Sequence, residues 1–485
     1  MKKIITVIYT LSFVIGAVSA QSVYDGVKIA DKDLNGTARF VGMGGAMGAL
    51  GGDITTMGTN PAGIGIYRSN DVMTSFSYSA YGMESKYEGQ KSTIDKNRWS
   101  FDNIGVVFAT KIGNQTPLRY VNFGFNYKRS KSFYKNMSMS GMMGVVENPS
   151  NPGSPYYVSQ TNSMALQATD AERYVWDNSR QHLDFDNANR IFSDPDAGWL
   201  GALGYQGGLT ERDRIDNEPD LYVPFLPVEP SSVFNSREKG GIDQYDFNVS
   251  FNINDRVYLG LTIGAYDVDY DKYSGYDESY KRGEGYSLES YNNISGSGFD
   301  VKMGLILRPF EYSPFRIGFA VHTPTFYKLT YSTSAIVTND YRDAKTDELK
   351  RIIVDTYDYV GDMKRDYRLV TPWKYNVSLG YTVGTSLALG AEYEYEDYST
   401  MKFKYSSNDG GGDMEFENAE VKNCLKGEHT FRIGAEYKVI PEFAFRLGYN
   451  YSSAVFRDEA VKYIPSNSLI TCLLYTSPSP RDYAA

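Results

Sequence analysis

The chain of 485 residues is poor in the residues that most often build stabilising or catalytic centres, with two cysteines and three histidines. Cys424 and Cys472 alone provide no framework of disulfide bonds. Acidic residues outnumber basic ones by 59 to 49, and the resulting charge of −10 argues against a nucleic-acid-binding protein, which needs a basic surface. Beyond the amino terminus there is no apolar run of the roughly 20 residues that a membrane helix requires, so a bundle of membrane helices is excluded.

Tyrosine and glycine are abundant instead. The chain has 42 tyrosines and 46 glycines, and its mean hydropathy is −0.42. Tyrosine is not among the commonest residues of soluble domains. Many Tyr and Gly with few Cys and no long apolar runs are typical of a chain of amphipathic strands.

The amino terminus predicts export. Lys2 and Lys3 precede an apolar stretch, and Val18-Ser19-Ala20 places small residues before a cleavage site at Gln21. This is the pattern of a signal peptide over residues 1–20, too short for a spanning helix. A buried amino-terminal helix is the alternative. We therefore expect an exported protein of a Gram-negative bacterium, located in the cell outer membrane.

The carboxyl terminus is not expected to be native. Residues 472–477 are a translation of a sequence that resembles a transposon mosaic end, and residues 478–482 fit the adapter bases that would follow. A Pro/Ser-rich tail is the alternative. We expect residues 472–485 to be a sequencing scar and the natural carboxyl end to be missing, so fold reasoning stops at residue 471.

Hydrophobicity alternates with period two over much of the chain, most clearly from Trp373 to Val383, Leu387 to Tyr395 and Phe431 to Tyr437. Alternation places one face of a strand in apolar surroundings and the other in water. Runs of about 10 residues match a tilted strand that crosses a bilayer. A soluble β-sandwich also alternates, but its strands are shorter, about 5–6 residues. The pattern, together with the signal peptide, favours an all-β fold, a transmembrane antiparallel β-barrel.

The same alternation predicts which side chains face lipid and which face the lumen. The lipid-facing set is Val377, Leu379, Leu389, Ile433, Phe445 and Leu447, and the lumen-facing set is Ser378, Gly390 and Gly434. Aromatic residues toward strand ends, such as Trp373 and Tyr381, are expected in the interfacial girdles. Glu392, Glu394 and Glu396 could line a polar lumen, but we favour plain water-facing alternates.

Eleven strands are expected in the barrel region, 72–471. Their ranges are 72–83, 99–111, 118–130, 241–253, 255–270, 297–309, 314–331, 366–383, 385–397, 427–439 and 442–453. Long and short connections alternate, and bacterial barrels keep the short turns in the periplasm. The stretches 131–240, 271–296, 332–365 and 398–426 are therefore expected as extracellular loops. Because barrels of this type close with an even number of strands, an odd number is expected to be missing.

The segment 21–71 is no strand. It contains the small-residue run Gly42-Met43-Gly44-Gly45-Ala46-Met47 and, after it, Asn60-Pro61-Ala62-Gly63. This block resembles the amino-terminal hatch of the FadL/TodX family of outer-membrane transporters for hydrophobic compounds. Thr371 to Asn376 and Arg432 to Tyr437 are similar to later strands of that family, in the form seen in Bacteroidetes-like sequences.

This resemblance implies about 14 strands in the intact protein, with the segment 21–71 as a hatch inside the lumen. It implies passive uptake of hydrophobic molecules, with long-chain fatty acids favoured, by capture at the extracellular loops, movement of the hatch and release sideways through the wall. Haem or an aromatic hydrocarbon remains an alternative cargo. A surface barrel without transport, such as an adhesin, is an alternative of another class. Partners are then hydrophobic small molecules and outer-membrane lipids, and a monomer is expected.

Within the hatch, two groups of residues are assigned the gating role. Asn60-Pro61-Ala62-Gly63 would form a stiff bend, because proline fixes one backbone angle and Asn bonds nearby backbone. Phe40, Met43 and Met47 would offer adaptable apolar surface. A Gly-rich loop, or a turn that only fixes the start of the first strand, is the alternative.

Residues 131–240 are expected to form a long binding loop, since loops of this length are usually lids or binding elements. Residues 163–180 are helix-compatible, while 148–155 and 224–230 are typical of irregular loop. Candidate ligand contacts in this loop are Met142, Met143, Trp176, Trp199, Leu200 and Phe225. A self-packed loop without ligand contact is equally compatible with the sequence.

Other motifs do not predict chemistry. Gly42-x-Gly44 has Met47 where a dinucleotide fingerprint needs glycine, and residues 31–36 open like a calcium loop that lacks its final Glu at Gly42. His182, His322 and His429 are far apart in sequence, and each is expected at the surface, with metal or haem ligation as the alternative. No Walker loop, nucleophile elbow or His-Glu-x-x-His occurs. We therefore expect no enzyme, no cofactor and no metal site.

Overall fold

The computed structural model describes residues 23–87, 90–146, 156–157, 159–194, 196–214, 217–225, 230–440 and 443–457. The expected signal peptide, the expected scar and most of the irregular stretches around residues 150 and 228 lie outside these residues. Within the described part of the chain, no helix is long and apolar enough to span a membrane.

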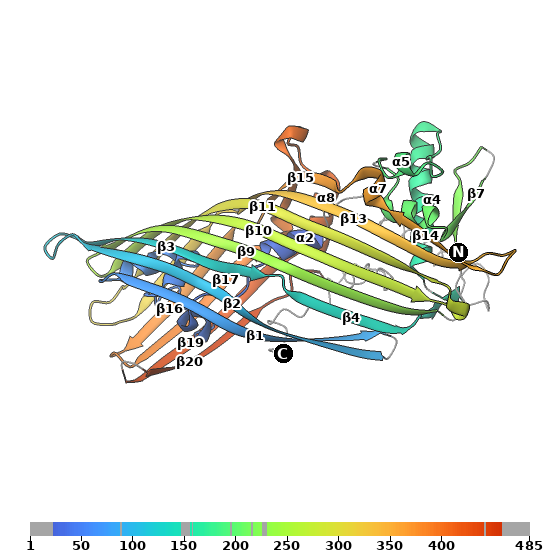
Figure 1. Ribbon diagram of the computed structural model, residues 1–485. Coiled ribbons are helices and arrows are strands. Elements are labelled where there is room, and N and C mark those ends of the chain that lie inside the picture. The colour runs from blue at the N-terminus through green and yellow to red at the C-terminus, as the bar shows by residue number, and fades with distance from the viewer. Residues whose placement is uncertain are drawn as a thin grey trace.

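The expected all-β, antiparallel architecture is confirmed: eleven strands follow one another around a single curved sheet, called the wall below (Figure 1). In order they are β1 (Asp71–Tyr87), β2 (Gln90–Lys111), β3 (Leu118–Ser132), β9 (Ser231–Ile253), β10 (Val257–Ser279), β11 (Gly285–Leu307), β12 (Arg316–His322), β16 (Lys374–Val383), β17 (Leu387–Asp397), β19 (Gly427–Ile440) and β20 (Phe443–Ser452). Among the described residues β1 and β20 do not pair, so the sheet is not closed.

Further strands extend the wall at the end with long connections. They are β4 (Lys135–Met142), which pairs with β9, and β13 (Phe326–Arg342), β14 (Leu349–Asp355), β15 (Met363–Val370) and β18 (Lys402–Tyr405). Pro324 separates β12 from β13, and Pro372 separates β15 from β16. The sheet continues across this break, because Thr371 donates its N–H to the carbonyl of Thr325 at 3.1 Å and accepts the N–H of Thr325 at its hydroxyl.

Several strands, β9, β10 and β11 among them, are longer than the sequence pattern predicts, and the prediction of loops over 271–296 and 332–365 is wrong. The single strands predicted over 314–331 and 366–383 are also wrong, because each is divided at a proline. β10 and β11 pair from Ser279 and Gly285 down to Val257 and Leu307 without interruption. Likewise β4 and the first half of β9 take part of the stretch 131–240 into the wall. At this end the outward positions of β10 carry Asp267, Asp269 and Asp271, and beyond Tyr270 the inward positions carry Lys272 and Ser274, so the hydrophobic contrast of period two is lost from there on.

The predicted facing of the middle of each strand is confirmed. The outward residues are exposed and form an apolar belt: Phe247, Leu259, Leu261, Ile263, Phe299, Met303, Val377, Leu379, Leu389, Ile433, Phe445 and Leu447. Ser378 is 1% exposed, and Gly390 and Gly434 are buried on the concave side. Trp373 and Tyr381 are exposed at the two ends of the β16 region, as expected for interfacial aromatics.

Four short helices fold against the concave face of the wall, at the end with short turns or above it (Figure 1). They are α2 (Val23–Ala30), α3 (Ala38–Gly42), η2 (Ile54–Gly58) and η3 (Pro61–Ile66). Residues 31–66 are called the hatch below. The chain enters β1 at Asp71 directly after it.

At the opposite end the chain forms a helical subdomain from α4 (Gln160–Ser179), α5 (Ala188–Ile191), α6 (Trp199–Gln206), β7 (Thr210–Asp213) and β8 (Leu221–Pro224) (Figure 1). Met164, Ala168, Phe185 and Leu203 form its core. The predicted helix over 163–180 is confirmed by α4, which begins after the cap Ser159. Shorter elements are β5 (Val145–Val146), β6 (Tyr156–Tyr157), η4 (Lys281–Gly283), α7 (Thr356–Val360), η5 (Tyr398–Thr400), η6 (Ser407–Asp409) and α8 (Glu415–Cys424).

Candidate functional site: the hatch and the lumen above it

A buried network of hydrogen bonds holds the hatch together. The Asp53 carboxylate is fully buried and accepts the Thr37 hydroxyl at 2.6 Å and the N–H of Thr55 at 2.9 Å. The N–H of Thr37 in turn donates to the Thr55 hydroxyl at 3.0 Å. Gly51 and Gly52 directly precede Asp53 and have φ of 58° and 65°, values that favour glycine. The hatch is therefore a defined structure and not a loose Gly-rich loop.

Asn60-Pro61-Ala62-Gly63 begins helix η3. Asn60 is its N-cap and accepts the N–H of Ala62 at 3.2 Å, and Pro61 takes the first helical position, where its missing N–H costs nothing. The carbonyl of Pro61 accepts hydrogen bonds from Asn248 and Ser250 of β9, at 3.3 and 3.1 Å. The motif thus fixes one edge of the hatch to the wall as well as starting a helix.

The wall meets the hatch through a belt of glycines on neighbouring strands. Gly380, Gly390, Gly434 and Gly448 are consecutive partners in register across β16, β17, β19 and β20, and Gly260 pairs with Gly304. A methyl group on any of them would overlap or crowd the hatch main chain or the Asn60 side chain. At Gly380, for example, it would lie 3.2 Å from the carbonyl carbon of Ala49. These glycines let the hatch backbone lie directly on the sheet.

Buried ion pairs surround the same contact. Arg39 and Arg446 both bind the carboxylate of Glu436, and the N–H of Gly48 donates to Glu392 at 3.0 Å. Glu392 and Glu394 share Arg432, at 2.6 and 2.9 Å. The interpretation of the three glutamates as plain water-facing alternates is wrong: Glu392, Glu394 and Glu396 are 5%, 4% and 8% exposed, because the hatch and partner cations cover this stretch of the lumen.

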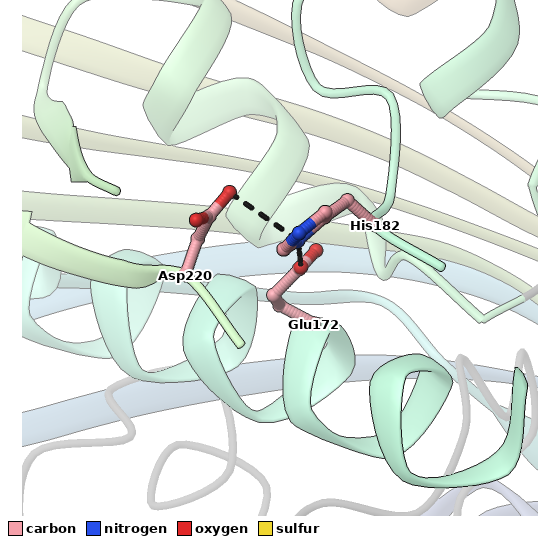
Figure 2. Close-up of side chains that lie close together, drawn as sticks. All are labelled: Glu172, His182 and Asp220. Carbon is pink, nitrogen blue, oxygen red and sulfur yellow. Dashed lines mark hydrogen bonds and ion pairs between the residues drawn. The ribbon is translucent and has the colours of Figure 1, made fainter. Parts of the chain in front are cut away.

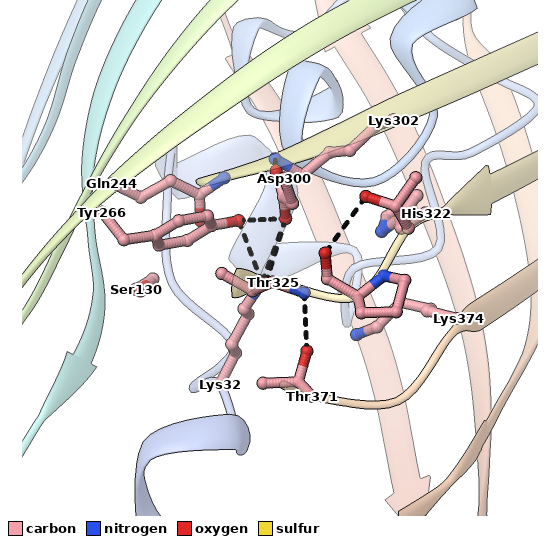
Figure 3. A network of polar contacts seen from close by, with 12 residues as sticks. Lys32, Ser130, Gln244, Tyr266, Asp300, Lys302, His322, Thr325, Thr371 and Lys374 are labelled. Carbon is pink, nitrogen blue, oxygen red and sulfur yellow. Dashed lines mark hydrogen bonds and ion pairs between the residues drawn. The ribbon is translucent and has the colours of Figure 1, made fainter. Parts of the chain in front are cut away.

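A second polar network lies where β10 to β12 pass the hatch (Figure 3). The ammonium of Lys302 is fully buried between Asp246 and Asp300, at 3.0 and 2.8 Å, and Tyr266 donates to Asp300 at 2.7 Å. Lys32 of the hatch reaches the Tyr266 hydroxyl at 3.0 Å. Polar groups on the wall therefore hold the hatch on this side too.

The expectation that all three histidines lie at the surface is wrong for His322. This residue is 4% exposed, and its Nε2 is 2.7 Å from the carbonyl oxygen of Thr59. In β12 buried and less buried positions alternate, and His322 lies at a buried position on the lumen side, where the hatch covers its ring (Figure 3). His429 is exposed and bonds Tyr393, whereas His182 joins a buried pair of acids.

Above the hatch the lumen is apolar and aromatic. Helix α2 packs there against strands β9 to β18 in a cluster that includes Val23, Ile29, Phe133, Tyr266, Tyr270, Tyr327, Tyr367, Leu369, Met401 and Phe403. We call this the lumen cluster. At Gly26 of α2 a methyl group would lie 2.6 Å from the Phe403 ring, so the helix is closely seated. Helix α2 thus occupies apolar space in the lumen.

Three lysines border the lumen cluster around a single glutamate. Glu238 of β9 lies between Lys272 of β10 and Lys135 of β4, its partners in register, and Lys28 of α2 binds it at 2.9 Å. Within the described residues no carboxylate lies within ion-pairing distance of Lys135 or Lys272. Lys272 is only 9% exposed. Sequence analysis missed these lysines, because strand register is what brings them together.

One stretch of the wall is not joined by main-chain hydrogen bonds. β2 pairs with β3 only from Asn103 to Lys111, while residues 90–102 of β2 pair with β1 alone. Opposite them, β4 pairs with β9 alone. Side chains bridge the two edges: Lys96 donates to Asn136 at 3.1 Å, and the guanidinium of Arg98 lies 3.3 Å above the Tyr134 ring. We call this stretch the seam.

The candidate contacts predicted in 131–240 do not gather on one surface. Met142 of β4 is 52% exposed and Met143 is buried, whereas Trp199 and Leu200 pack on the core of the helical subdomain. The ring of Trp176 contacts that of His182 in a tilted arrangement, and Phe225 lies near Tyr280. In the hatch, by contrast, Phe40, Met43 and Met47 lie together with Leu50 in one buried cluster.

Comparison with known proteins yields structural likeness only. No family model matches the chain, and no curated protein matches its sequence. Among solved structures it is similar to the toluene transporter TbuX of Ralstonia pickettii, with 13% identity over 87% of this chain and 88% of that chain and a TM-score of 0.39. It is also similar to the toluene transporter TodX of Pseudomonas putida, with 9% identity over 88% of this chain and 86% of that chain and a TM-score of 0.39. A FadL homologue of Pseudomonas aeruginosa matches with 12% identity over 88% of this chain and 82% of that chain and a TM-score of 0.40.

Two of these structures bear the names of the family that the sequence resembles. Identities of this size and TM-scores below 0.5 carry no argument about cargo or mechanism. The function is therefore argued from the residues of this chain.

Proposed function

We propose that the protein is an outer-membrane channel for the passive uptake of hydrophobic molecules, with long-chain fatty acids as the cargo. The observation that carries this proposal is the lumen cluster: an apolar, tyrosine-rich space inside the wall, bordered by lysines and separated from the short-turn end by the hatch. An apolar chain gains about 0.8 kcal/mol for each methylene that leaves water, so such a molecule needs no aqueous pore.

The lysines favour a cargo with an acidic head group. Lys135 and Lys272 bring two positive charges beside the apolar cluster, and Glu238 is already bound by Lys28. A buried cation is costly without a counter-charge, and a fatty-acid carboxylate would supply one while its tail enters the lumen cluster. A neutral aromatic hydrocarbon would use only the apolar part of this site.

Uptake requires two parts of the lumen to move. Helix α2 fills the apolar space, so we propose that cargo displaces it and takes its place among the same aromatic side chains. The hatch is the second part, with Asn60-Pro61-Ala62-Gly63 as the element that holds it closed and Phe40, Met43 and Met47 as its apolar interior. Because the hatch rests on glycines through its main chain, it can shift as a unit without unfolding.

Cargo leaves sideways through the seam in this proposal. Hydrophobic cargo gains nothing by entering the aqueous periplasm, and a gap in the wall leads it into the membrane. The seam is favoured over the break at Pro324 and Pro372, because main-chain hydrogen bonds cross that break and only side chains cross the seam. Phe133, next to Tyr134 of the seam, belongs to the lumen cluster and contacts Tyr270.

The test is the identity of lipid bound to the protein purified from outer membranes, measured by mass spectrometry after solvent extraction. Fatty acid at about one molecule per chain, and its loss in Lys135→Gln/Lys272→Gln, would support the proposal. The matched control Lys350→Gln changes an exposed lysine that pairs with Asp343. Haem or an aromatic hydrocarbon in its place would overturn the choice of cargo, and a chain with no bound hydrophobic molecule would favour a surface barrel without transport.

A further inference from the structure

Three side chains of the helical subdomain converge on one point, far along the sequence from the hatch (Figure 2). They are Glu172 of α4, His182 of the loop that follows α4, and Asp220, which precedes β8. The Nδ1 of His182 is 2.5 Å from Oε1 of Glu172 and 3.5 Å from Oδ2 of Asp220. One potential ligand atom from each residue lies within 4.8 Å of the others.

The two carboxylates are buried and oriented by other donors. Glu172 is 0% and Asp220 3% exposed. The N–H of Leu183 donates to Glu172 at 2.9 Å, and Arg212 donates to Asp220 at 2.5 Å. Carboxylates that bind metal ions are typically fixed by such outer hydrogen bonds. His182 closes the group from the solvent side, with its side chain 38% exposed and its ring tilted against that of Trp176, with the ring centres 4.7 Å apart.

The charges in this cluster do not balance. Arg212 compensates Asp220, but among the described residues Glu172 has no cationic partner except His182, and a neutral imidazole would leave this buried carboxylate uncompensated. A second observation points the same way. The hydroxyl of Tyr222 is buried without a hydrogen-bond partner, and Tyr222, two residues after Asp220, lies opposite Arg212 in the β7–β8 ladder and interacts electrostatically with both Glu172 and Asp220. Among the described residues, Glu172 therefore has no counter-ion except His182, and a buried hydroxyl near the cluster has no hydrogen-bond partner.

We infer that Glu172, His182 and Asp220 bind a divalent transition-metal ion, with Zn²⁺ as the reference ion and water at the remaining position. Zinc takes imidazole nitrogen and carboxylate oxygen in tetrahedral geometry, and an imidazole ligand favours Zn²⁺, Cu²⁺ or Ni²⁺ over Ca²⁺ and Mg²⁺. Two ligands about 2.0–2.1 Å from one ion in this geometry are about 3.3 Å apart, so the His182 ring moves outward by less than 1 Å on binding.

The bound ion would tie three separate segments of the subdomain together. Helix α4, the loop after its left-handed end at Arg180 and the β7–β8 hairpin each contribute one ligand. An ion at this point fixes the fold of the subdomain at the mouth of the wall. The ion would bind independently of the cargo, so this inference can be tested separately from the proposed function.

The experiment measures zinc on the full chain in detergent. Protein is stripped with a chelator and titrated with Zn²⁺ at pH 7.5 against a chromophoric competitor, and bound zinc is counted by elemental mass spectrometry. Wild type, His182→Ala and Glu172→Gln are compared with His429→Ala, which removes an exposed histidine whose ring contacts Tyr393 and Tyr395. Folding of each variant is checked by circular dichroism.

One zinc ion per chain in wild type and in His429→Ala, with affinity at least about tenfold weaker in His182→Ala, is the expected result. Excess Ca²⁺ should not displace it, and bound Co²⁺ should give d–d absorption that is lost in His182→Ala. If Glu172→Gln does not fold, His182→Ala still decides, because its side chain is partly exposed. Absence of stoichiometric zinc in wild type, or equal affinity in His182→Ala, would overturn the inference and leave a protonated His182 as the partner of Glu172.

Discussion

Arg39 of the hatch and Glu436 of β19 form a two-armed ion pair, with Nε and Nη2 of the arginine 3.0 and 3.1 Å from the two carboxylate oxygens. The Glu436 side chain is 2% exposed, and Arg446 of β20 donates to it at 2.7 Å. Arg39 also donates to the carbonyl of Gly52 within the hatch. This pair therefore joins the hatch internally and to the wall at one point.

Removal of Arg39 should loosen the closed hatch. Arg39→Gln leaves Glu436 with Arg446 alone, and the loss of a hydrogen-bonded partner of a charged group costs about 1–3 kcal/mol. We expect a higher sensitivity of cells to a large antibiotic that the outer membrane normally excludes. Arg351→Gln is the control, because Arg351 pairs with Asp340 at the exposed end of the wall. Equal sensitivity of both variants and wild type would mean that Arg39 does not hold the hatch.

Arginine on the outward face should impair insertion into the membrane. Leu379→Arg or Leu389→Arg places a charge in the apolar belt and should cost about 2–4 kcal/mol if the residue lies near the bilayer midplane. The measurement is urea unfolding in lipid vesicles. Thr382→Arg, at a half-buried lumen-side position of the same hairpin, is the matched control and should cost less. Ser378 is unsuited as the control, since a larger side chain there would meet Gly48 of the hatch.

Sequence periodicity predicts the wall well where lipid lies on one side and the crowded lumen on the other. Val377, Leu379 and Ile433 alternate with small residues, and the structure places them as expected. The prediction fails where this contrast ends, as in the aspartate-rich outer half of β10. The close approach of Gly390 to the main chain of Ala46, and the meeting of Glu172 with Asp220, depend on tertiary register and have no local signal.

The border lysines should discriminate cargo by charge. Lys272→Gln removes one of the two cations near Glu238 that lack an ion pair among the described residues. We expect weaker binding of oleate and unchanged binding of methyl oleate, which has the same tail without the charge. Binding is measured by titration of the detergent-solubilised protein with labelled ligand. If both ligands lose affinity equally, Lys272 stabilises the fold and does not bind the head group.

Locking the seam should slow release. Cysteines at Lys96 and Asn136, joined by a reducible bifunctional maleimide, would tie the two unpaired edges together. The background is Cys424→Ser/Cys472→Ser, although burial raises the pKa of the Cys424 thiol and slows its reaction. Uptake of labelled oleate should fall on cross-linking and recover on reduction.

The matched control for the seam joins two edges that are already paired. Cysteines at Ser138 and Asn235 lie in register on β4 and β9, so the same reagent there restrains nothing new. Equal inhibition by both cross-links would show a general effect of the reagent. No inhibition by either would place the exit elsewhere.

Uptake of labelled oleate by cells tests the central claim most directly. The host lacks its own fatty-acid porin and carries a full-length version of the protein that includes the missing carboxyl-terminal strands. Wild type, Asn60→Ala, Pro61→Ala and the control Gly412→Ala, a loop glycine with open space around it, are compared at matched outer-membrane levels. Loss of the Asn60 cap costs about 1 kcal/mol, which shifts the hatch toward its open state by up to about fivefold. We predict uptake in wild type, equal uptake in Gly412→Ala and faster uptake in the two hatch variants. Absence of uptake in wild type, or unchanged uptake in both hatch variants, would contradict the account.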